Sequence, residues 1–318
     1  MLLSYNNIVF ILLLLSVSVW GQDRKIDAVA LLTNTRILSS DYYQGRKTDT
    51  EGGRRARQFV SNKFRQIGLE VIPGGPGIQQ DFNFYNKLYN LHAKGSNIIG
   101  YVKGELWEDP REGCIIVGAH YDHLGVYEGN TYFGADDNAS GVSAMFEIAK
   151  SFIDEKPQIP IVFISFDAEE LQCAGSQYFV ESNVIPHESI FLFVNMDMIS
   201  ISDEYNLGVS GTHYYHEYKK FVVEAAQGKM INMDFGHDKA RDKENNWVES
   251  SDHSEFHKLN IPFIYFGVEE HEHYHRTTDT FDKINIGFFV EAAQSILNFI
   301  DLVDNKKSFQ RYHRKLLK

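Results

Sequence analysis

Apolar and polar residues alternate along this chain in two recurring patterns. Short, nearly continuous apolar runs, which are typical of buried strands, occupy residues 96–104, 114–124, 159–168, 190–199 and 261–268. Apolar residues at the helical spacing of three to four positions occupy residues 139–153, 175–181, 216–227 and 287–303. Strands that are apolar on both faces need cover on both faces. The pattern therefore predicts an α/β fold with a mixed, mostly parallel central β-sheet flanked by helices on both faces.

The organisation along the chain predicts a single domain. No Pro/Ser-rich linker, low-complexity tract or repeat interrupts residues 26–304, and a basic tail follows at residues 305–318. The apolar core of the N-terminus, residues 8–15, is shorter than the roughly 20 residues that a membrane span requires. We therefore interpret residues 1–21 as a signal peptide and expect a secreted or periplasmic protein. An uncleaved anchor stays open as an alternative, because no Lys or Arg precedes the apolar run.

Charge and cysteine content narrow the classes of partner and scaffold. The formal net charge of −12 argues against nucleic acid or an anionic membrane as partner, because phosphates require a basic face. The two cysteines, Cys114 and Cys173, are too few for a disulfide-stapled scaffold. One disulfide between them is possible but is not predicted.

The stretch "FISFDAEELQ" combines a buried strand with three neighbouring carboxylates, Asp167, Glu169 and Glu170. Carboxylates that are close together repel one another, and burial raises the free energy of their ionised forms. Something positively charged is expected beside them.

Side chains that can bind metals follow the apolar strands. The ends of four predicted strands carry His120 with Asp122, Glu169 with Glu170, Asp197, and, after a longer run, His275. Ligands of an open α/β sheet bind beyond the carboxyl ends of its strands, and His, Asp and Glu suit a cation such as zinc. The loop "GADDNASG" adds Asp136 and Asp137, although plain helix capping is an alternative for this loop.

Six ordered motifs resemble those of the M28 zinc peptidases, the aminopeptidase Y or leucyl-aminopeptidase-like group. They are "GAHYDHLG", "FGADDNASG", "FDAEELQCAGS", "VNMDMIS", "SSDHSEFHKLNIPF" and "YHRTTDT". The resemblance extends from about residue 45 to the closing helix, so it covers nearly the whole chain after the N-terminal segment.

The resemblance implies a site for two zinc ions, although other divalent metals are possible. It assigns His120 and Asp197 to one ion, Glu170 and His275 to the other, and Asp137 to both. It also implies a cis peptide bond after Asp137.

Three further residues receive catalytic roles from the same resemblance. Glu169 is expected to be the general base, and Asp122 is expected to orient His120. Tyr274 is a candidate donor to the oxyanion, with loop packing as the alternative.

Other polar and aromatic residues near the motifs are expected to be structural. Asp279 is expected in a turn or a cap, and Trp247 either at the pocket edge or packed under a loop. His271 and His273 are expected in an exposed acidic loop. The remaining structural residues are Asp136, Asp252 and His253.

The predicted function is a secreted or periplasmic aminopeptidase. It would hydrolyse N-terminal peptide bonds with a water activated by two zinc ions and with Glu169 as base. The partners are therefore peptides with a free N-terminus. Two alternatives are a glutaminyl cyclase-like acyltransferase with a single zinc, and a non-catalytic binding module. The sequence predicts neither the residue preference nor the oligomeric state.

Overall fold

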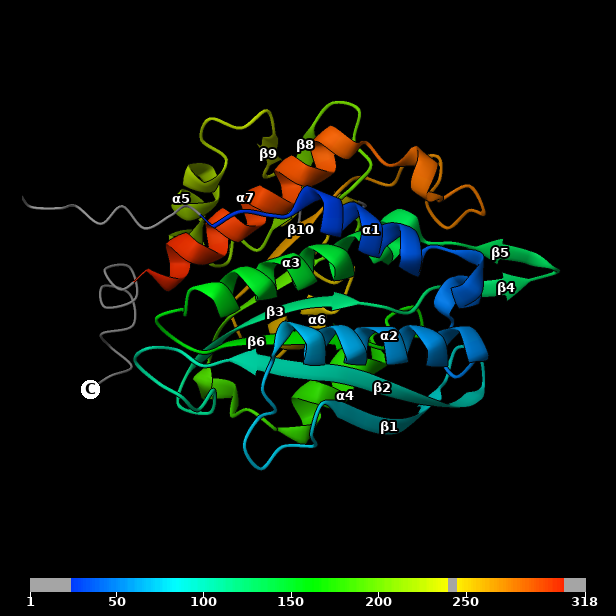
Figure 1. The fold of residues 1–318 in the computed structure, drawn as a ribbon, viewed down its shortest axis with the longest axis horizontal. Coiled ribbons are helices and arrows are strands. Elements are labelled where there is room, and N and C mark those ends of the chain that lie inside the picture. Colours follow the sequence, from blue (N-terminus) through cyan, green and yellow to red (C-terminus); the bar gives the residue numbers. More distant parts are fainter. Residues whose placement is uncertain (1–23, 240–244, 306–318) are drawn as a thin grey trace, which may run out of the picture.

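The computed structural model describes residues 24–239 and 245–305 (Figure 1). The predicted signal peptide, residues 1–21, lies outside the described residues, as does the tail from residue 306 onward.

One sheet of eight strands runs through the molecule in the order β1-β2-β6-β3-β7-β10-β8-β9. The four central strands β6, β3, β7 and β10 are parallel to one another, and β1, β2 and β8 pair with antiparallel neighbours. The predicted mixed sheet with a parallel centre is therefore confirmed. Its strands are β1 Gln79–Asn86, β2 Leu91–Val102, β3 Cys114–His120, β6 Ile161–Phe166, β7 Ile190–Met196, β8 Asn206–Ser210, β9 Asn232–Asp234 and β10 Phe263–Gly267.

Helices cover both faces of this sheet (Figure 1). Helices α4 (Ala174–Ser182) and α6 (His253–His257) pack on one face. The other face carries α1 Ala28–Leu38, α2 Glu51–Ile67, α3 Gly141–Asp154, α5 His216–Ala225 and α7 Ile286–Asp304. A separate hairpin of β4 (Gly125–Tyr127) and β5 (Asn130–Tyr132) extends from the sheet.

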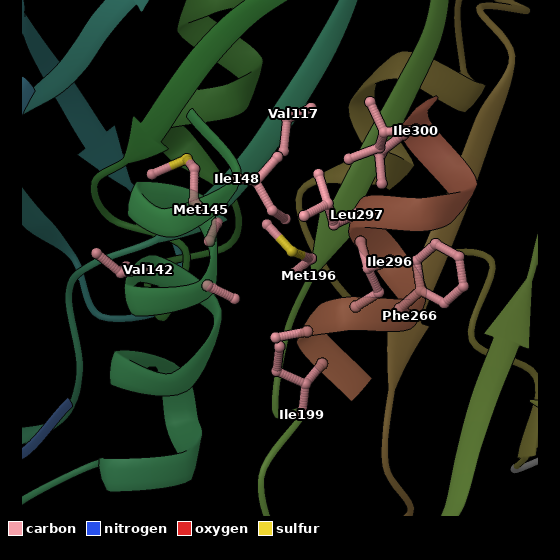
Figure 2. Close-up of a cluster of buried hydrophobic side chains, with 14 of the residues drawn as sticks. Val117, Val142, Met145, Ile148, Met196, Ile199, Phe266, Ile296, Leu297 and Ile300 are labelled. Atoms are coloured by element: carbon pink, nitrogen blue, oxygen red, sulfur yellow. The ribbon is translucent and has the colours of Figure 1, made fainter. Parts of the chain in front are cut away.

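The central strand β3 contributes side chains to both layers of the core. Val117 belongs to the cluster with α3 and α7, whereas Ile116 belongs to the cluster with α4 and α6. Figure 2 shows Val117 between Met145 and Ile148 of α3 and side chains of α7, among them Leu297. Complete burial of one such side chain contributes about 1.5 to 3 kcal/mol relative to exposure. This two-sided burial explains why β3 reads as a continuous apolar run.

Helix α7 is long and apolar enough to meet the length and composition test for a membrane span. It nevertheless packs into the core with Phe288, Phe289 and Leu297 fully buried. Asn285 caps its first turn by accepting a hydrogen bond from the Phe288 amide at 3.2 Å. Helix α7 is therefore a core helix of the domain.

The parallel centre of the sheet brings candidate ligands to one edge. His120 is the last residue of β3, Asp197 directly follows β7, and Glu170 lies in the turn after β6. Asp137 lies in the short turn Ala135–Ser140 that leads into α3. The fold thus places four residues from different segments at the carboxyl ends of neighbouring strands.

Candidate metal centre

The first donor set consists of His120, Asp197 and Asp137. His120 Nε2 lies 3.1 Å from Asp197 Oδ1 and 3.4 Å from Asp137 Oδ1. Ligands of one tetrahedral zinc ion, with bonds of about 2.0 to 2.1 Å, lie about 3.3 Å from one another. The separations in this set therefore fit a common cation.

The second donor set shares Asp137 and adds Glu170 and His275. His275 Nε2 lies 3.2 Å from Asp137 Oδ2 and 3.4 Å from Glu170 Oε2. Asp137 thus turns Oδ1 toward the first set and Oδ2 toward the second. The structure brings together all five residues that the sequence proposed as ligands, and the peptide bond between Asp137 and Asn138 is cis, as the resemblance implied.

Sequence reasoning missed a sixth residue, His123, which forms with Asp137 and Glu170 a group whose possible ligand atoms all lie within 4.8 Å of one another. Its Nδ1 lies 2.7 Å from Glu170 Oε1 and 3.5 Å from Asp137 Oδ2, and its side chain is fully buried. Burial lowers the pKa of His123 to about 3, so the ring is neutral. The signal that could have identified it is the second histidine of "HYDH", three positions after His120.

Glu169 belongs to neither donor set but faces the same space. It lines a cleft of about 320 Å³ together with Asp137, Glu170, Asp197 and His275. Burial raises the pKa of Glu169 well above its usual range; His120 opposes this rise, whereas Asp197 and Glu170 add to it. Glu169 therefore lies beside both donor sets without belonging to either.

The electrostatics of the two sets indicate that a cation belongs here. Burial raises the pKa of Asp137, and the neighbouring Glu170 carboxylate raises it further. Burial raises the pKa of Glu170 to about 7. Burial alone would lower the pKa of His120, but Asp197 and Glu169 outweigh it and raise that pKa well above its usual value. Burial alone would raise the pKa of Asp197, but His120 outweighs this effect and lowers it. Without a metal, the carboxylates depend on protons and on His120 for compensation.

Asp122 contacts the candidate base more directly than it contacts His120. Its Oδ1 accepts a hydrogen bond from the Glu169 amide at 3.1 Å, and its Oδ2 accepts one from the Glu170 amide at 3.3 Å. His120 Nδ1 lies 3.2 Å from the Asp122 carbonyl oxygen and 3.7 Å from Oδ1. The residue therefore supports His120 mainly through its backbone, while its carboxylate fixes the turn that carries both glutamates.

Asp167, the first carboxylate of "FDAEELQ", does not face the donor sets. Its Oδ1 accepts a hydrogen bond from Thr48 Oγ1 at 2.8 Å, and its Oδ2 accepts bonds from Tyr121 Oη at 2.7 Å and from the Ser96 amide at 2.9 Å. Burial nevertheless raises its pKa to about 7. Asp167 therefore anchors the end of β6, and the demand for positive charge comes from Glu169 and Glu170.

The loop that carries Asp137 is tied to the loop that carries His275. Asp279 accepts hydrogen bonds from the Asp136 amide at 2.9 Å and from the Asp137 amide at 3.1 Å, in the capping role expected for it. Asp136 Oδ2 lies 2.9 Å from His271 Nε2. The expected exposed loop is therefore wrong for His271, which is half-buried because it pairs with this fully buried carboxylate.

Arg46 supports the loop that carries Asp137. Its guanidinium group is fully buried and donates hydrogen bonds to main-chain carbonyl groups, among them those of Tyr121, Gly134 and Asp137. Burial lowers the pKa of Arg46 to about 10, which still leaves it charged at neutral pH. A permanent positive charge therefore lies behind the acidic cluster.

Three aromatic residues, Tyr274, Trp247 and Tyr265, line the cleft. Tyr274 stacks on the His275 ring with centroids 3.9 Å apart, and both residues line the cleft. Trp247 also lines it, which supports the pocket-edge position considered for this residue, and it stacks on the His237 ring with centroids 3.5 Å apart.

The segment "SSDHSEF" lies behind the cleft. His253 is fully buried, with Nε2 at 2.6 Å from the Trp247 carbonyl oxygen. Asp252 is also fully buried, and among the described residues neither carboxylate oxygen has a hydrogen-bond partner of ordinary geometry. Burial raises the pKa of Asp252 to about 7. Cys173 and Cys114 are both free thiols.

Several solved structures share this fold. A glutaminyl cyclase from Porphyromonas gingivalis has a TM-score of 0.71 at 18% identity, and the match covers 88% of this chain and 99% of that one. The zinc aminopeptidase BSAP from Bacillus subtilis has a TM-score of 0.70 at 17% identity, with 88% and 96% covered. At these identities the likeness concerns the fold alone.

Sequence comparison gives the family. Aminopeptidase YwaD of Bacillus subtilis is 30% identical over an alignment of 276 residues that covers 77% of this chain and 56% of that protein. A glutamate carboxypeptidase 2 homolog of Caenorhabditis elegans is 32% identical over 137 residues, or 39% of this chain and 16% of that protein. The chain thus spans only part of the length of these curated relatives. The sequence profile of Peptidase family M28 matches residues 97–300, most of the described chain. This protein therefore belongs to peptidase family M28.

Proposed function

We propose that this protein is a metal-dependent aminopeptidase that uses two divalent cations, with zinc as the expected metal. The observation that carries the proposal is the position of Asp137, whose two oxygens face different donor sets at 3.4 and 3.2 Å. Glu169, a carboxylate outside both sets, lines the same cleft. A shared carboxylate with a nearby free one is the arrangement that metal-assisted amide hydrolysis needs.

His120, Asp137 and Asp197 would hold one cation, and Asp137, Glu170 and His275 the other. When bound, the two cations supply Lewis acidity and lower the pKa of water toward neutrality. The donor set of imidazole and carboxylate groups suits zinc, and each cation would have three protein ligands, as is usual for catalytic zinc.

Glu169 performs the proton transfers in this proposal. Its carboxylate accepts a proton from the attacking water and delivers it to the nitrogen of the departing amine. The hydrogen bond from its amide to Asp122 fixes the turn that carries it. The Tyr274 hydroxyl group, at the wall of the cleft, is the proposed donor to the oxyanion.

The proposed substrates are peptides with a free N-terminus. Met198, Trp247, Tyr265 and Val268 give the cleft an apolar wall for a side chain, and Glu270 adds a carboxylate among its lining residues. The apolar segment at residues 8–15 supports a secreted or periplasmic location.

The test is the hydrolysis of a panel of aminoacyl p-nitroanilides, before and after chelation and zinc restoration. We expect activity that is lost with the chelator and returns with zinc. Glu169→Gln should reduce kcat by about 10²- to 10⁴-fold with metal content unchanged, because it removes only the proton acceptor. Glu272→Gln is the matched control, since that side chain is 88% exposed.

Two results would count against the proposal. One is full activity in Glu169→Gln. The other is no hydrolysis of any panel member by protein that carries two zinc ions. In the second case, cyclisation of peptides with N-terminal glutamine is the next assay, because the fold is shared with a glutaminyl cyclase over 88% of this chain.

A further inference from the structure

His123 is a buried histidine beside the second donor set to which neither the family resemblance nor the proposed mechanism assigns a role. Its Nδ1 lies 2.7 Å from Glu170 Oε1, while Glu170 Oε2 lies 3.4 Å from His275 Nε2. The two oxygens of Glu170 therefore have different partners at different separations.

These separations distinguish a hydrogen bond from shared coordination. Two ligands of one tetrahedral zinc ion lie about 3.3 Å apart, which agrees with the distance from His275 to Glu170 Oε2. The distance of 2.7 Å from His123 to Oε1 is too short for two ligands. It is the length of a charge-assisted N–H···O⁻ hydrogen bond, about 2.7 to 2.9 Å.

Packing holds the His123 ring in this orientation. The ring is fully buried, and a Cβ atom at Gly134 would lie 2.6 Å from His123 Cδ2. Gly134 has φ 57°, a left-handed conformation that glycine adopts without strain. The absence of a side chain at this position therefore leaves the space that the imidazole occupies.

We propose that His123 is a positioning residue that donates its Nδ1–H to Glu170 Oε1 and thereby directs Glu170 Oε2 to the second cation. The inference rests on the two-cation site proposed above. The second cation then has Asp137, Glu170 and His275 as its protein ligands. If His123 were itself a ligand, four protein groups would surround this cation, the closed pattern of structural zinc sites.

Two substitutions separate a hydrogen-bond donor from a ligand. In His123→Asn, the amide nitrogen is as many bonds from Cα as Nδ1, so it can donate to Glu170 but is a poor zinc ligand. His123→Leu removes both abilities. His92→Asn, at an exposed position on β2, is the matched control for the loss of a histidine.

The measurement is zinc stoichiometry and the Kd of each cation, by competition with a chromophoric chelator. We expect His123→Leu to weaken the second cation by about 10- to 100-fold and to leave the first unchanged, the usual effect of losing a partner of a metal ligand. His123→Asn should stay within about 3-fold of the wild type. Equal losses in the two variants would identify His123 as a ligand, and an unchanged Kd in His123→Leu would exclude both roles.

A measurement on the unmodified protein keeps the inference testable if His123→Leu does not fold. In zinc-loaded protein with ¹⁵N-labelled histidine, we expect the His123 ring to keep its proton on Nδ1. A metal-shifted, unprotonated Nδ1 would overturn the inference. Wild-type protein that binds a single cation would instead contradict the proposed two-cation function, so the two failures are distinguishable.

Discussion

The two halves of the candidate metal centre are built in different ways. The half with His120 and Asp197 is formed at strand ends, and these side chains are 1% and 10% exposed. The half with Glu170 and His275 lies on a turn and a loop, and these side chains are 11% and 39% exposed. His275 also has φ 52°, an uncommon conformation for a residue with a side chain.

This difference shows where supporting residues are needed. The sheet positions His120 and Asp197 directly, because neighbouring parallel strands fix their relative register. The loop half depends on other groups, namely the His123 hydrogen bond to Glu170 and the capping of the Asp137 turn by Asp279. We therefore expect the halves to respond differently to the same disturbance.

The largest effect should come from Asp137→Asn, which removes the one ligand that both halves share. We expect both cations to bind more weakly and activity to fall by about 10³-fold or more, because the charge between the two sites is lost. Metal content after dialysis and kcat/KM test this. Asp203→Asn, at an exposed position, is the control. Retention of both cations at the wild-type Kd would contradict a shared ligand.

The next effect should come from Arg46→Met, which removes the buried support of the Asp137 loop. The guanidinium group donates to the carbonyl groups of Leu38, Tyr121, Phe133, Gly134 and Asp137. Buried carbonyl groups left without donors cost about 1 to 3 kcal/mol each, although local relaxation offsets part of the sum. We expect the free energy of unfolding to fall by about 4 kcal/mol in urea titrations.

The control for this variant is Arg54→Met, because Arg54 is exposed and, among the described residues, pairs only with Glu51 on the same helix. It should change the free energy of unfolding by less than about 1 kcal/mol. Equal stability of the two variants would show that the buried guanidinium group does not hold the loop.

A chelator titration should then separate the halves themselves. The cation at Glu170 and His275 should leave first, with a Kd about 10- to 100-fold weaker, because its site is more exposed and lies on loops. His275→Asn should remove this cation and leave the other, whereas His120→Asn should do the reverse. Simultaneous loss of both cations in both variants would show that the halves do not act separately.

The parts of the fold and site that the sequence predicted are those fixed by local pattern. The apolar runs identified the central strands, and their ends gave His120 and Asp197. Helix α1, an element that periodicity did not identify, has the polar residues Asn34 and Thr35 on its buried side, so its apolar stripe is interrupted. Its place is set by packing against α3 and α7, which no local pattern encodes.

The site residues that were misjudged depend on contacts between distant segments. His271 appeared to belong to an exposed loop because its neighbours are acidic, but its partner Asp136 lies 135 positions away in the chain. His123 was overlooked beside His120, because the direction of its Nδ1 depends on the turn that places Glu170. Residues whose role is set by a neighbour's orientation are the ones that spacing alone cannot assign.

The smallest expected effect concerns Asp252, which lies behind the strand-end half. Its pKa of about 7 in the folded protein exceeds the value of about 3.9 expected when unfolded, so the folded state binds more protons between these pH values. The free energy of unfolding of chelator-treated protein should therefore fall as pH rises, by up to about 2 kcal/mol from pH 5.5 to 7 through this group. In Asp252→Asn this contribution should disappear. Urea titrations at several pH values would measure the change, with Asp203→Asn as the control. If the free energy of unfolding of Asp252→Asn depended on pH as that of the wild type does, Asp252 would already be ionised at pH 5.5. A full negative charge would then lie behind His120 and Asp197, contrary to what the burial of Asp252 indicates.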